Sequence, residues 1–418
     1  MNAKEAVKER IRRDVIEGLD MSREQSDEEI GRMIDGRILA AEGDGGLTLV
    51  DKLSLRRELF NTLRRMDVLT VLLEDPEVTE IMVNGTDAIF CEKHGHIRKT
   101  ELRFESESRL LTVIQQIVAG CNRRVSHADP IVDARLPDGS RVNVVLDPVS
   151  IDGTALTIRK FAAEGMHMET LADFGAFDRE LIPMFSALVR GGYNILITGG
   201  TGAGKTTLLG ALANLIPKDE RIITIEDSAE LRIDGIENLV RLETRDAADD
   251  EGKSITVRDL IKASLRMRPD RIIVGEVRDA AAADMLQALN TGHDGSLSTL
   301  HANSARDAMD RLSTMVLTAM DIPIVAVRKQ IASAVDLVIH VGRCRDRSRK
   351  ILEICEVEGM NDGEIALRTL FEFKASDDTG GRVHGKLRRM RDLLHIEKLE
   401  QAGLLHEYRE GVIGSSEV

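Results

Sequence analysis

The sequence predicts an α/β protein: a parallel sheet covered by helices, preceded by a mixed α+β domain and an N-terminal helical bundle. Three observations support this. From about residue 172 strand-like and helix-like segments alternate, residues 63–161 hold short strands around tight turns, and apolar residues near the N-terminus recur every four positions. Alternating strands and helices are typical of parallel sheets, and a four-residue apolar spacing is typical of amphipathic helices.

The first segment, 1–62, is expected to form the N-terminal helical bundle. Apolar residues follow one helical face from Val7 to Leu19, and Ser26-x-x-Glu29 has the pattern of a capping box that begins the next helix. Neither stretch holds a chemical motif, so we predict no catalytic role for this bundle.

The next segment has the pattern of a mixed domain. TEIMVNG and AIFCE flank an Asn-Gly turn, VDARLPDGSRVNVVL contains two strands around a Pro-Asp-Gly-Ser turn, and LLTVIQQIVAG is an amphipathic helix. We assign 63–161 to the mixed α+β domain, 162–172 to a linker, 173–345 to the domain with the parallel sheet, and 346–418 to a C-terminal strand and helix extension of it.

Composition limits the class of protein. The chain has 418 residues, of which 42% are hydrophobic, so several globular domains are expected. It has no apolar run near the ~20 residues that span a bilayer, and its charged N-terminus has no apolar signal core. We expect a cytoplasmic protein. Cys91, Cys121, Cys344 and Cys355 form no Cys-x-x-Cys pair, which favours reduced thiols over zinc or disulfides.

Charge argues against a dedicated nucleic-acid binder. The formal net charge is -14, tryptophan is absent and there are two tyrosines, whereas such binders need a basic face and usually stacking aromatics. Basic clusters at 266–271, 343–350 and 386–391 are interpreted as solvated faces or subunit contacts. No nucleic-acid partner is expected.

The stretch NILITGGTGAGKTTLLGAL contains Gly199-x-x-x-x-Gly204-Lys205-Thr206, the Walker A pattern of a phosphate-binding loop. An apolar strand precedes it and a helix follows, so backbone N–H groups and the helix N-terminus can face a phosphate. The alternative is a glycine-rich turn without a ligand. We predict ATP and Mg²⁺ as cofactors, with Lys205 against the β- and γ-phosphates and Thr206 as the metal ligand. The predicted nucleotide-binding residues are Gly199, Gly200, Thr201, Gly202, Ala203, Gly204, Lys205, Thr206 and Thr207.

The strand RIIVGE ends in Gly275 and Glu276, where many phosphate-cleaving folds have an aspartate for magnesium before the glutamate for water. A carboxylate at the end of a strand beside a phosphate-binding loop can polarise an attacking water. Glu276 is therefore the predicted catalytic glutamate; the alternative is a surface glutamate that follows a strand.

Two further groups of polar residues are candidates for the site. His293 and His301 lie in a stretch rich in glycine, serine and threonine, with no third zinc ligand nearby. Glu226, Asp227 and Glu230 follow the strand RIITI. Histidines of this kind are commonly packed or surface residues, and grouped acids commonly form a solvated loop. Beside a phosphate-binding loop the histidines are catalytic candidates, and the acids can hold the waters of magnesium.

Together these motifs closely resemble those of the secretion-superfamily ATPases, which power type II and type IV secretion, type IV pili and archaella. TIEDSAEL matches the acidic box, RPDRIIVGEVRD the atypical Walker B, and NTGHDGSLSTLHANS the histidine box. EIMVNG and DARLPDGSRVN extend the resemblance to roughly residues 65–345. It implies a RecA-like P-loop domain. Without a four-cysteine zinc insertion, and with a long helical leader, the chain looks most like the tight-adherence (Tad/Flp) pilus branch.

The resemblance also implies residue roles. Glycine usually precedes the Walker B glutamate in this family, so Gly275 would leave space near the metal's water shell while Glu226 takes over part of the missing charge. Arginines of the family close over the nucleotide and stabilise the transition state. The matching candidates are Arg135, Arg141 and Arg159 of the mixed domain, and Arg241 and Arg245 are further candidates from the side of the acidic box. Each of them could instead be a surface arginine in a salt bridge.

The implied function is that of a homohexameric ATPase motor. Hydrolysis would swing the mixed domain against the P-loop domain and pass this motion to an inner-membrane platform protein that inserts pilins. The protein would then lie at the inner face of the cytoplasmic membrane, held there peripherally by its partner. The alternatives are a RecA-like DNA translocase or helicase, which would need a basic, aromatic channel, and a binding module that uses ATP only to assemble.

Overall fold

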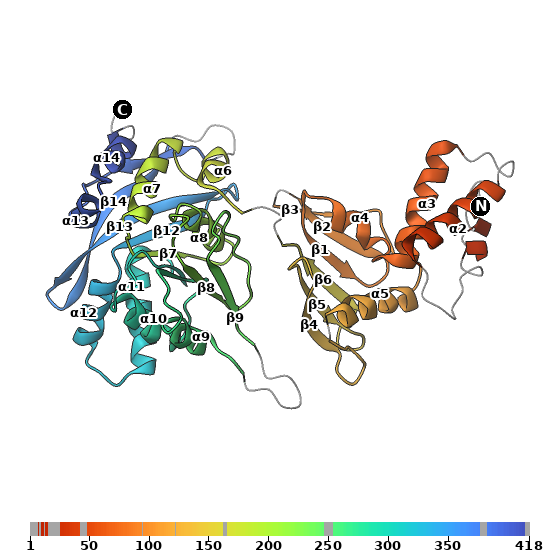
Figure 1. Ribbon diagram of the computed structural model, residues 1–418, viewed down its shortest axis with the longest axis horizontal. Coiled ribbons are helices and arrows are strands. Elements are labelled where there is room, and N and C mark those ends of the chain that lie inside the picture. The colour runs from red at the N-terminus through yellow and green to blue at the C-terminus, as the bar shows by residue number, and fades with distance from the viewer. Residues whose placement is uncertain are drawn as a thin grey trace. The chain divides into compact units, whose positions relative to one another are not determined.

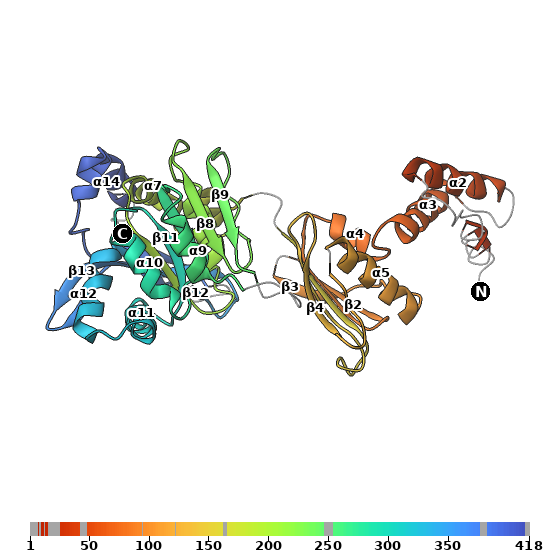
Figure 2. The ribbon, with the colours of Figure 1, turned by 60° about the horizontal axis from the view of Figure 1, so that its bottom comes forward.

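The computed structural model describes residues 7, 10–11, 13–15, 26–41, 48–93, 95–121, 123–161, 165–245, 254–376 and 383–413. The chain forms two compact units, Met1–Ala163 and Glu164–Val418; both are visible in Figures 1 and 2. Among the helices in these ranges, none is long and apolar enough to cross a membrane.

The first unit begins with packed helices. Helix α2 (Asp27–Ala40) starts at the predicted capping box, in which Ser26 and Glu29 exchange hydrogen bonds with each other's backbone. It lies beside α3 (Leu49–Arg64). Apolar side chains from both helices and from the segment before them form one small core: Ile11, Val15, Ile30, Ile34, Ile38, Ala41, Leu55 and Leu59. Leu19, expected on the same stripe, lies outside the described residues.

A six-stranded antiparallel sheet follows, in the order β3-β2-β1-β6-β5-β4. Its strands are β1 (Val78–Asn84), β2 (Ala88–Lys93), β3 (His96–Lys99), β4 (Ile131–Arg135), β5 (Arg141–Val145) and β6 (Ala155–Arg159). Helices α4 (Leu69–Glu74) and α5 (Glu107–Gly120) complete it; the apolar face of α5 packs into the core of the sheet. Alternating burial along the strands leaves one face apolar, which is typical of antiparallel sheets.

The second unit is built on a nine-stranded sheet in the order β15-β14-β13-β12-β7-β11-β10-β8-β9. The parallel strands are β7 (Ile195–Gly199), β8 (Ile222–Glu226), β9 (Leu239–Glu243), β10 (Arg271–Val274), β11 (Leu297–His301) and β12 (Leu337–Arg343). The antiparallel strands β13 (Arg349–Asn361), β14 (Glu364–Ala375) and β15 (Gly385–Arg389) extend the same sheet without a break.

Two layers of helices cover this sheet (Figure 1), and each layer packs apolar side chains into a core of its own. One contains α6 (Met168–Asp173), η1 (Arg179–Leu181), α7 (Ile182–Arg190), α8 (Lys205–Ala213), α13 (Glu397–Gln401) and α14 (Leu405–Ile413). The other contains α9 (Val257–Ser264), α10 (Ala281–Leu289), α11 (Ala305–Ala319) and α12 (Ile324–Ala334). Because both faces are covered, β7, β8 and β10 are buried at every position.

Helix α6 lies largely within 162–172, the segment assigned above to a linker. Its residues Met168 and Leu171 are buried in the core beside α8. The helix is only six residues long, so its apolar pattern is too short to distinguish from a connection.

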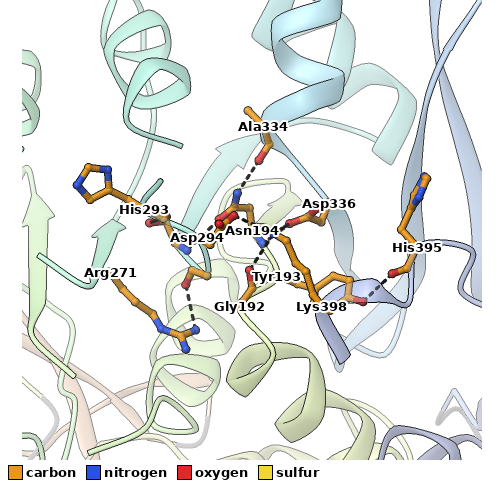
Figure 3. A network of polar contacts seen from close by, with 12 residues as sticks. Gly192, Tyr193, Asn194, Arg271, His293, Asp294, Ala334, Asp336, His395 and Lys398 are labelled. Carbon is orange, nitrogen blue, oxygen red and sulfur yellow. Dashed lines mark hydrogen bonds and ion pairs between the residues drawn. The ribbon is translucent and has the colours of Figure 1, made fainter. Parts of the chain in front are cut away.

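A polar network ties the strand starts together at the edge where β7 and β11 begin. The buried Asn194 side chain donates to the carbonyl of Ala334 at 2.8 Å and accepts from the amide of Ser296 at 3.1 Å. Its backbone amide donates to Asp336 Oδ2 at 2.7 Å. Figure 3 shows Asn194 between Ala334 and Asp336, with Lys398 contacting Asp336 and Gly192.

Replacing Asn194 by alanine should lower the free energy of unfolding by about 2 kcal/mol, because buried groups lose their partners. Urea denaturation measures this. The matched control is Asn290→Ala, since the exposed Asn290 side chain makes one hydrogen bond within the described part of the chain, to the Gln330 carbonyl at 3.2 Å. Equal, small effects of the two substitutions would show that the network adds nothing to stability.

Candidate active site

The parallel strands bring their carboxyl ends to one edge of the second unit. Gly199 pairs with His301 across β7 and β11, and Ser298 of β11 pairs with Val274 of β10. The end of β10 in turn lies beside Ile225 of β8. This edge is where ligands of α/β sheets bind, and it collects the Walker A loop, the histidine at the end of β11 and the two acidic motifs.

The Walker A loop has the shape of a phosphate cradle. Gly202 and Gly204 have φ of 70° and 96°, values that favour glycine, and a Cβ on Gly199 would collide with the Val341 carbonyl of β12. Helix α8 begins at Lys205, directly after the loop. The loop residues thus fit a nucleotide's phosphates: the glycines leave room, and the helix N-terminus supplies amides.

Lys205 is buried, with 7% of its surface exposed. Its Nζ donates to the Gly200 carbonyl at 3.1 Å and lies 3.3 Å from His301 Nδ1. Burial, aided by the charge of Arg278, lowers the pKa of Lys205, and Glu276 opposes this shift. A buried ammonium group with carbonyl and imidazole neighbours is a favourable place for an anion.

His301 connects the lysine to the catalytic candidate Glu276. Its Nε2 lies 3.2 Å from Glu276 Oε1. Burial, together with the positive charge of Lys205, lowers the pKa of His301, so the imidazole is neutral at neutral pH. A neutral ring with its proton on Nε2 accepts from Lys205 and donates to Glu276. The structure thus brings Lys205, His301 and Glu276 into one chain of polar contacts.

Glu276 has a second partner that the sequence reasoning missed. Arg278 Nη2 donates to Glu276 Oε2 at 2.7 Å. Burial raises the pKa of Glu276, but the hydrogen bond and charge of Arg278, aided by His301 and Lys205, bring it below its ordinary value. The available signal was that Arg278 stands two residues after Glu276 in GEVRD.

Gly275 allows the two acidic motifs to pack against each other. A Cβ at residue 275 would stand 2.9 Å from Glu226 Cγ. Glu226 is 3% exposed, and its Oε2 accepts from the amides of Glu230 and Leu231 at 2.7 and 2.9 Å. Burial raises the pKa of Glu226 although these amides oppose it. Its Oε1 has no hydrogen-bond partner among the described residues.

His293 lies at the other end of β11. It precedes the strand, whereas His301 ends it, and five strand residues correspond to about 16 Å. Its Nδ1 contacts the Ala288 carbonyl at 3.1 Å, and Figure 3 shows it beside Asp294, close to the Asn194 network. The structure does not bring His293 to Lys205 or Glu276. Spacing in a turn-rich stretch could not show that a whole strand separates the two histidines.

The candidate arginines fall into two groups. In the first unit Arg135 pairs with Arg141, and Arg141 with Arg159, so these three stand in a row across β4, β5 and β6. In the second unit Arg241 lies in β9, beside the acidic box, and its charge lowers the pKa of Glu226 against the larger effect of burial. Arg245 follows β9 and pairs with Ile255 through the backbone.

These features define a P-loop nucleoside triphosphatase: a glycine cradle, a buried lysine at the start of a helix, and a glutamate at the end of a neighbouring strand. The chain belongs to the Type II/IV secretion system protein family, whose profile matches residues 64–398. It is an ATPase of this family. The resemblance inferred from the motifs is confirmed at this level, and the tight-adherence branch stays a prediction.

Relatives align along most of the chain. A putative conjugal transfer protein of Mycobacterium tuberculosis is 34% identical over 343 residues, 77% of this chain and 97% of its own. The conjugal transfer protein TrbB of Rhizobium radiobacter is 33% identical, over 70% of this chain and 88% of its own. The type IV secretion system protein PtlH of Bordetella pertussis is 32% identical, over 69% and 93%.

Solved structures share the fold. The pilus retraction motor PilT superposes with a TM-score of 0.51 at 20% identity, covering 82% of this chain and 88% of PilT. The ATPase DotB of Yersinia pseudotuberculosis gives 0.51 at 18% identity, covering 67% and 76%. The predicted fold class, a RecA-like P-loop domain preceded by a mixed α+β domain, is confirmed.

Substituting Gly275 should damage the site, because Glu226 is buried and anchored and cannot move away from a new Cβ. Gly275→Ala should cost about 1–3 kcal/mol of stability and reduce turnover, and Gly275→Asp should be worse. Thermal unfolding and an ATPase assay measure both effects. The control is Gly120→Ala, where a Cβ would meet open space. Normal turnover of Gly275→Asp would contradict the packing argument.

Proposed function

We propose that this chain is the motor of a pilus or secretion system of the tight-adherence (Tad/Flp) branch. It couples hydrolysis of ATP, with Mg²⁺, to the assembly or secretion of subunits through an inner-membrane platform protein. The observation that carries the proposed hydrolysis is the contact chain Lys205–His301–Glu276 at the P-loop edge, in a chain of the secretion family. The choice of branch rests on the motifs EIMVNG, DARLPDGSRVN and LRMRPDRIIVGEVR.

In this proposal the P-loop binds the phosphates of the nucleotide, and Glu276 activates the attacking water. The amides of residues 199–207 and the Lys205 ammonium hold the β- and γ-phosphates. Glu276 orients and polarises the attacking water. The neutral His301 imidazole contacts both Lys205 and Glu276. A displacement of Lys205 on phosphate binding would therefore change the contacts of Glu276.

The metal role rests on Thr206 and on the acidic box. Mg²⁺ would supply neutralisation of charge on the β- and γ-phosphate oxygens. The Thr206 hydroxyl would hold it as the first residue after the P-loop lysine. Oε1 of Glu226, which has no hydrogen-bond partner in the part of the chain that the structure describes, is an acceptor that would hold one of the waters of Mg²⁺. This would explain why residue 275 is glycine and need not be an aspartate.

Arginines of the first unit would complete the site on domain closure. Arg135, Arg141 and Arg159 form a row of positive charge on one sheet, and charge that develops on the γ-phosphate is stabilised by such groups. We propose that closure is tied to a homohexameric ring. Arg241 and Arg245 are the corresponding candidates beside the acidic box.

We propose that the protein is located at the inner face of the cytoplasmic membrane, where it binds the platform protein. The names of PtlH, a type IV secretion system protein, and TrbB, a conjugal transfer protein, support a transport system as the setting. A DNA translocase is the second candidate, and the net charge of -14 speaks against it.

Two substitutions separate binding from hydrolysis. Glu276→Gln should keep nucleotide affinity and lower turnover roughly 10²-fold or more, because the general base is removed. Lys205→Ala should weaken ATP binding itself, since its charge meets the phosphates in the ground state. Calorimetry and phosphate release measure the two quantities. Near-normal turnover of Glu276→Gln would refute the assignment, and stimulation by single-stranded DNA would favour the translocase.

Activity should also depend on assembly. Specific activity is expected to rise with protein concentration, and Arg135→Ala and Arg141→Ala should reduce turnover more than binding, because their charge acts in the transition state. The control is Arg98→Ala, on the exposed strand β3 of the same sheet. An active monomer in sedimentation, or unchanged turnover in both variants, would remove these arginines from the site.

A further inference from the structure

We propose that Arg278 is a positioning residue: it bridges the Glu276 carboxylate to Asp227 of the acidic box and so holds the catalytic glutamate in place. The inference rests on the proposed role of Glu276 in hydrolysis. It assigns a function to a residue that the motif comparison left without one.

The bridge is made by both ends of one guanidinium group. Arg278 Nη2 donates to Glu276 Oε2 at 2.7 Å, and Nη1 lies 3.3 Å from Asp227 Oδ2. Glu276 follows β10 and Asp227 follows β8, which are neighbouring parallel strands. A planar guanidinium can hold two carboxylates in a defined geometry, which a lysine ammonium does less well. The bridge thus couples the loops that follow these two strands.

The backbone on both sides of Arg278 is fixed. The amide of Val277, a fully buried residue, donates to the Thr299 carbonyl of β11 at 2.9 Å. Asp279 has φ of 47°, a left-handed conformation that aspartate tolerates better than most residues, and its carbonyl accepts from Ala282 as α10 begins. Arg278 therefore projects from a short, anchored turn, and its side chain is placed beside Glu276 by the main chain.

The other oxygen of Glu276 contacts His301, so each oxygen has one partner among the residues that the structure describes. The charged or titratable groups that act on Glu276 are Arg278 from its own loop, His301 from β11 and Lys205 from α8. Of these, Arg278 lowers the pKa of Glu276 the most, against burial, which raises it. The hydrogen bond that Arg278 donates to Glu276 raises the pKa of Arg278 the most, against burial, and the charges of Asp227 and Asp279 also raise it.

If Arg278 acts on the charge of Glu276, its removal must change the pH profile of kcat. A purely structural role of Arg278 would leave that profile unchanged. Glu276 must be ionised to polarise water, so turnover falls as pH drops through its pKa. Burial raises the pKa of Glu276, and Arg278 is the main group that lowers it. Removal of Arg278 should therefore raise this pKa. The acidic limb of the pH profile of kcat must then move to higher pH.

The test compares Arg278→Ala, Arg278→Lys and Asp227→Asn in the full chain, with kcat, KM and the pH profile as readouts. Arg278→Ala should lower kcat about 10-fold or more, with KM little changed, and should move the acidic limb upward by a measurable fraction of a pH unit. Arg278→Lys should return the acidic limb to its original pH, because it keeps the positive charge. It should restore only part of kcat. Asp227→Asn should lower kcat without moving the limb upward.

The matched control is Arg328→Ala. It removes another arginine–glutamate pair, in which Nη1 of Arg328 on α12 lies 2.6 Å from Oε1 of Glu364. It should leave kcat and the pH profile as in the parent protein. A folded Arg278→Ala variant with normal kcat, or with reduced kcat and an unshifted acidic limb, would overturn the inference. If Glu276→Gln also turned over normally, the proposed function itself would fail; if only Arg278→Ala did, the failure would concern Arg278 alone.

Discussion

The parallel pairing of β7, β11, β10 and β8 is the constraint on which the site depends. Gly199 pairs with His301, and Val274 pairs with Ser298. Because of this register, the Walker A loop, the histidine and the Walker B glutamate all lie at the same edge of the sheet. Their backbone groups are already used in the ladders, so the side chains cannot shift register without exposing fully buried strands. The distances within the site are a consequence of this pairing.

Electrostatics then shape the edge that the sheet has formed. Lys205 and Glu276 are opposite charges at a partly buried site, and the neutral His301 lies between them and contacts both. Each charge is partly desolvated, and unpaired charges in such surroundings are costly. His301 and Arg278 reduce this cost in different ways: the imidazole by hydrogen bonding to both groups, the guanidinium by direct pairing with the glutamate.

The C-terminal strands take part in the site and are more than an extension of the sheet. Arg349, at the start of β13, donates from Nε to the Gly202 carbonyl of the P-loop at 3.0 Å. Thr198 Oγ1, just before the loop, lies 3.0 Å from Nδ1 of the buried His340 of β12, whose pKa is lowered by burial. The loop is therefore supported from the side of β12 and β13, while β10 and β11 carry the catalytic candidates.

The sequence by itself determined what depends on neighbours along the chain. The Walker A glycines, the Ser26 capping box and the alternation of strands and helices are local patterns, and each is present as predicted. Only the tertiary structure decided what depends on strand order and register: that His301 lies at Glu276 while His293 lies a strand length away, that Gly275 is required by Glu226, and that Arg278 joins Glu276 to Asp227. The physical reason is that residues far apart in the sequence meet only through strand pairing, and a pattern of types and spacings carries no record of which strands lie side by side.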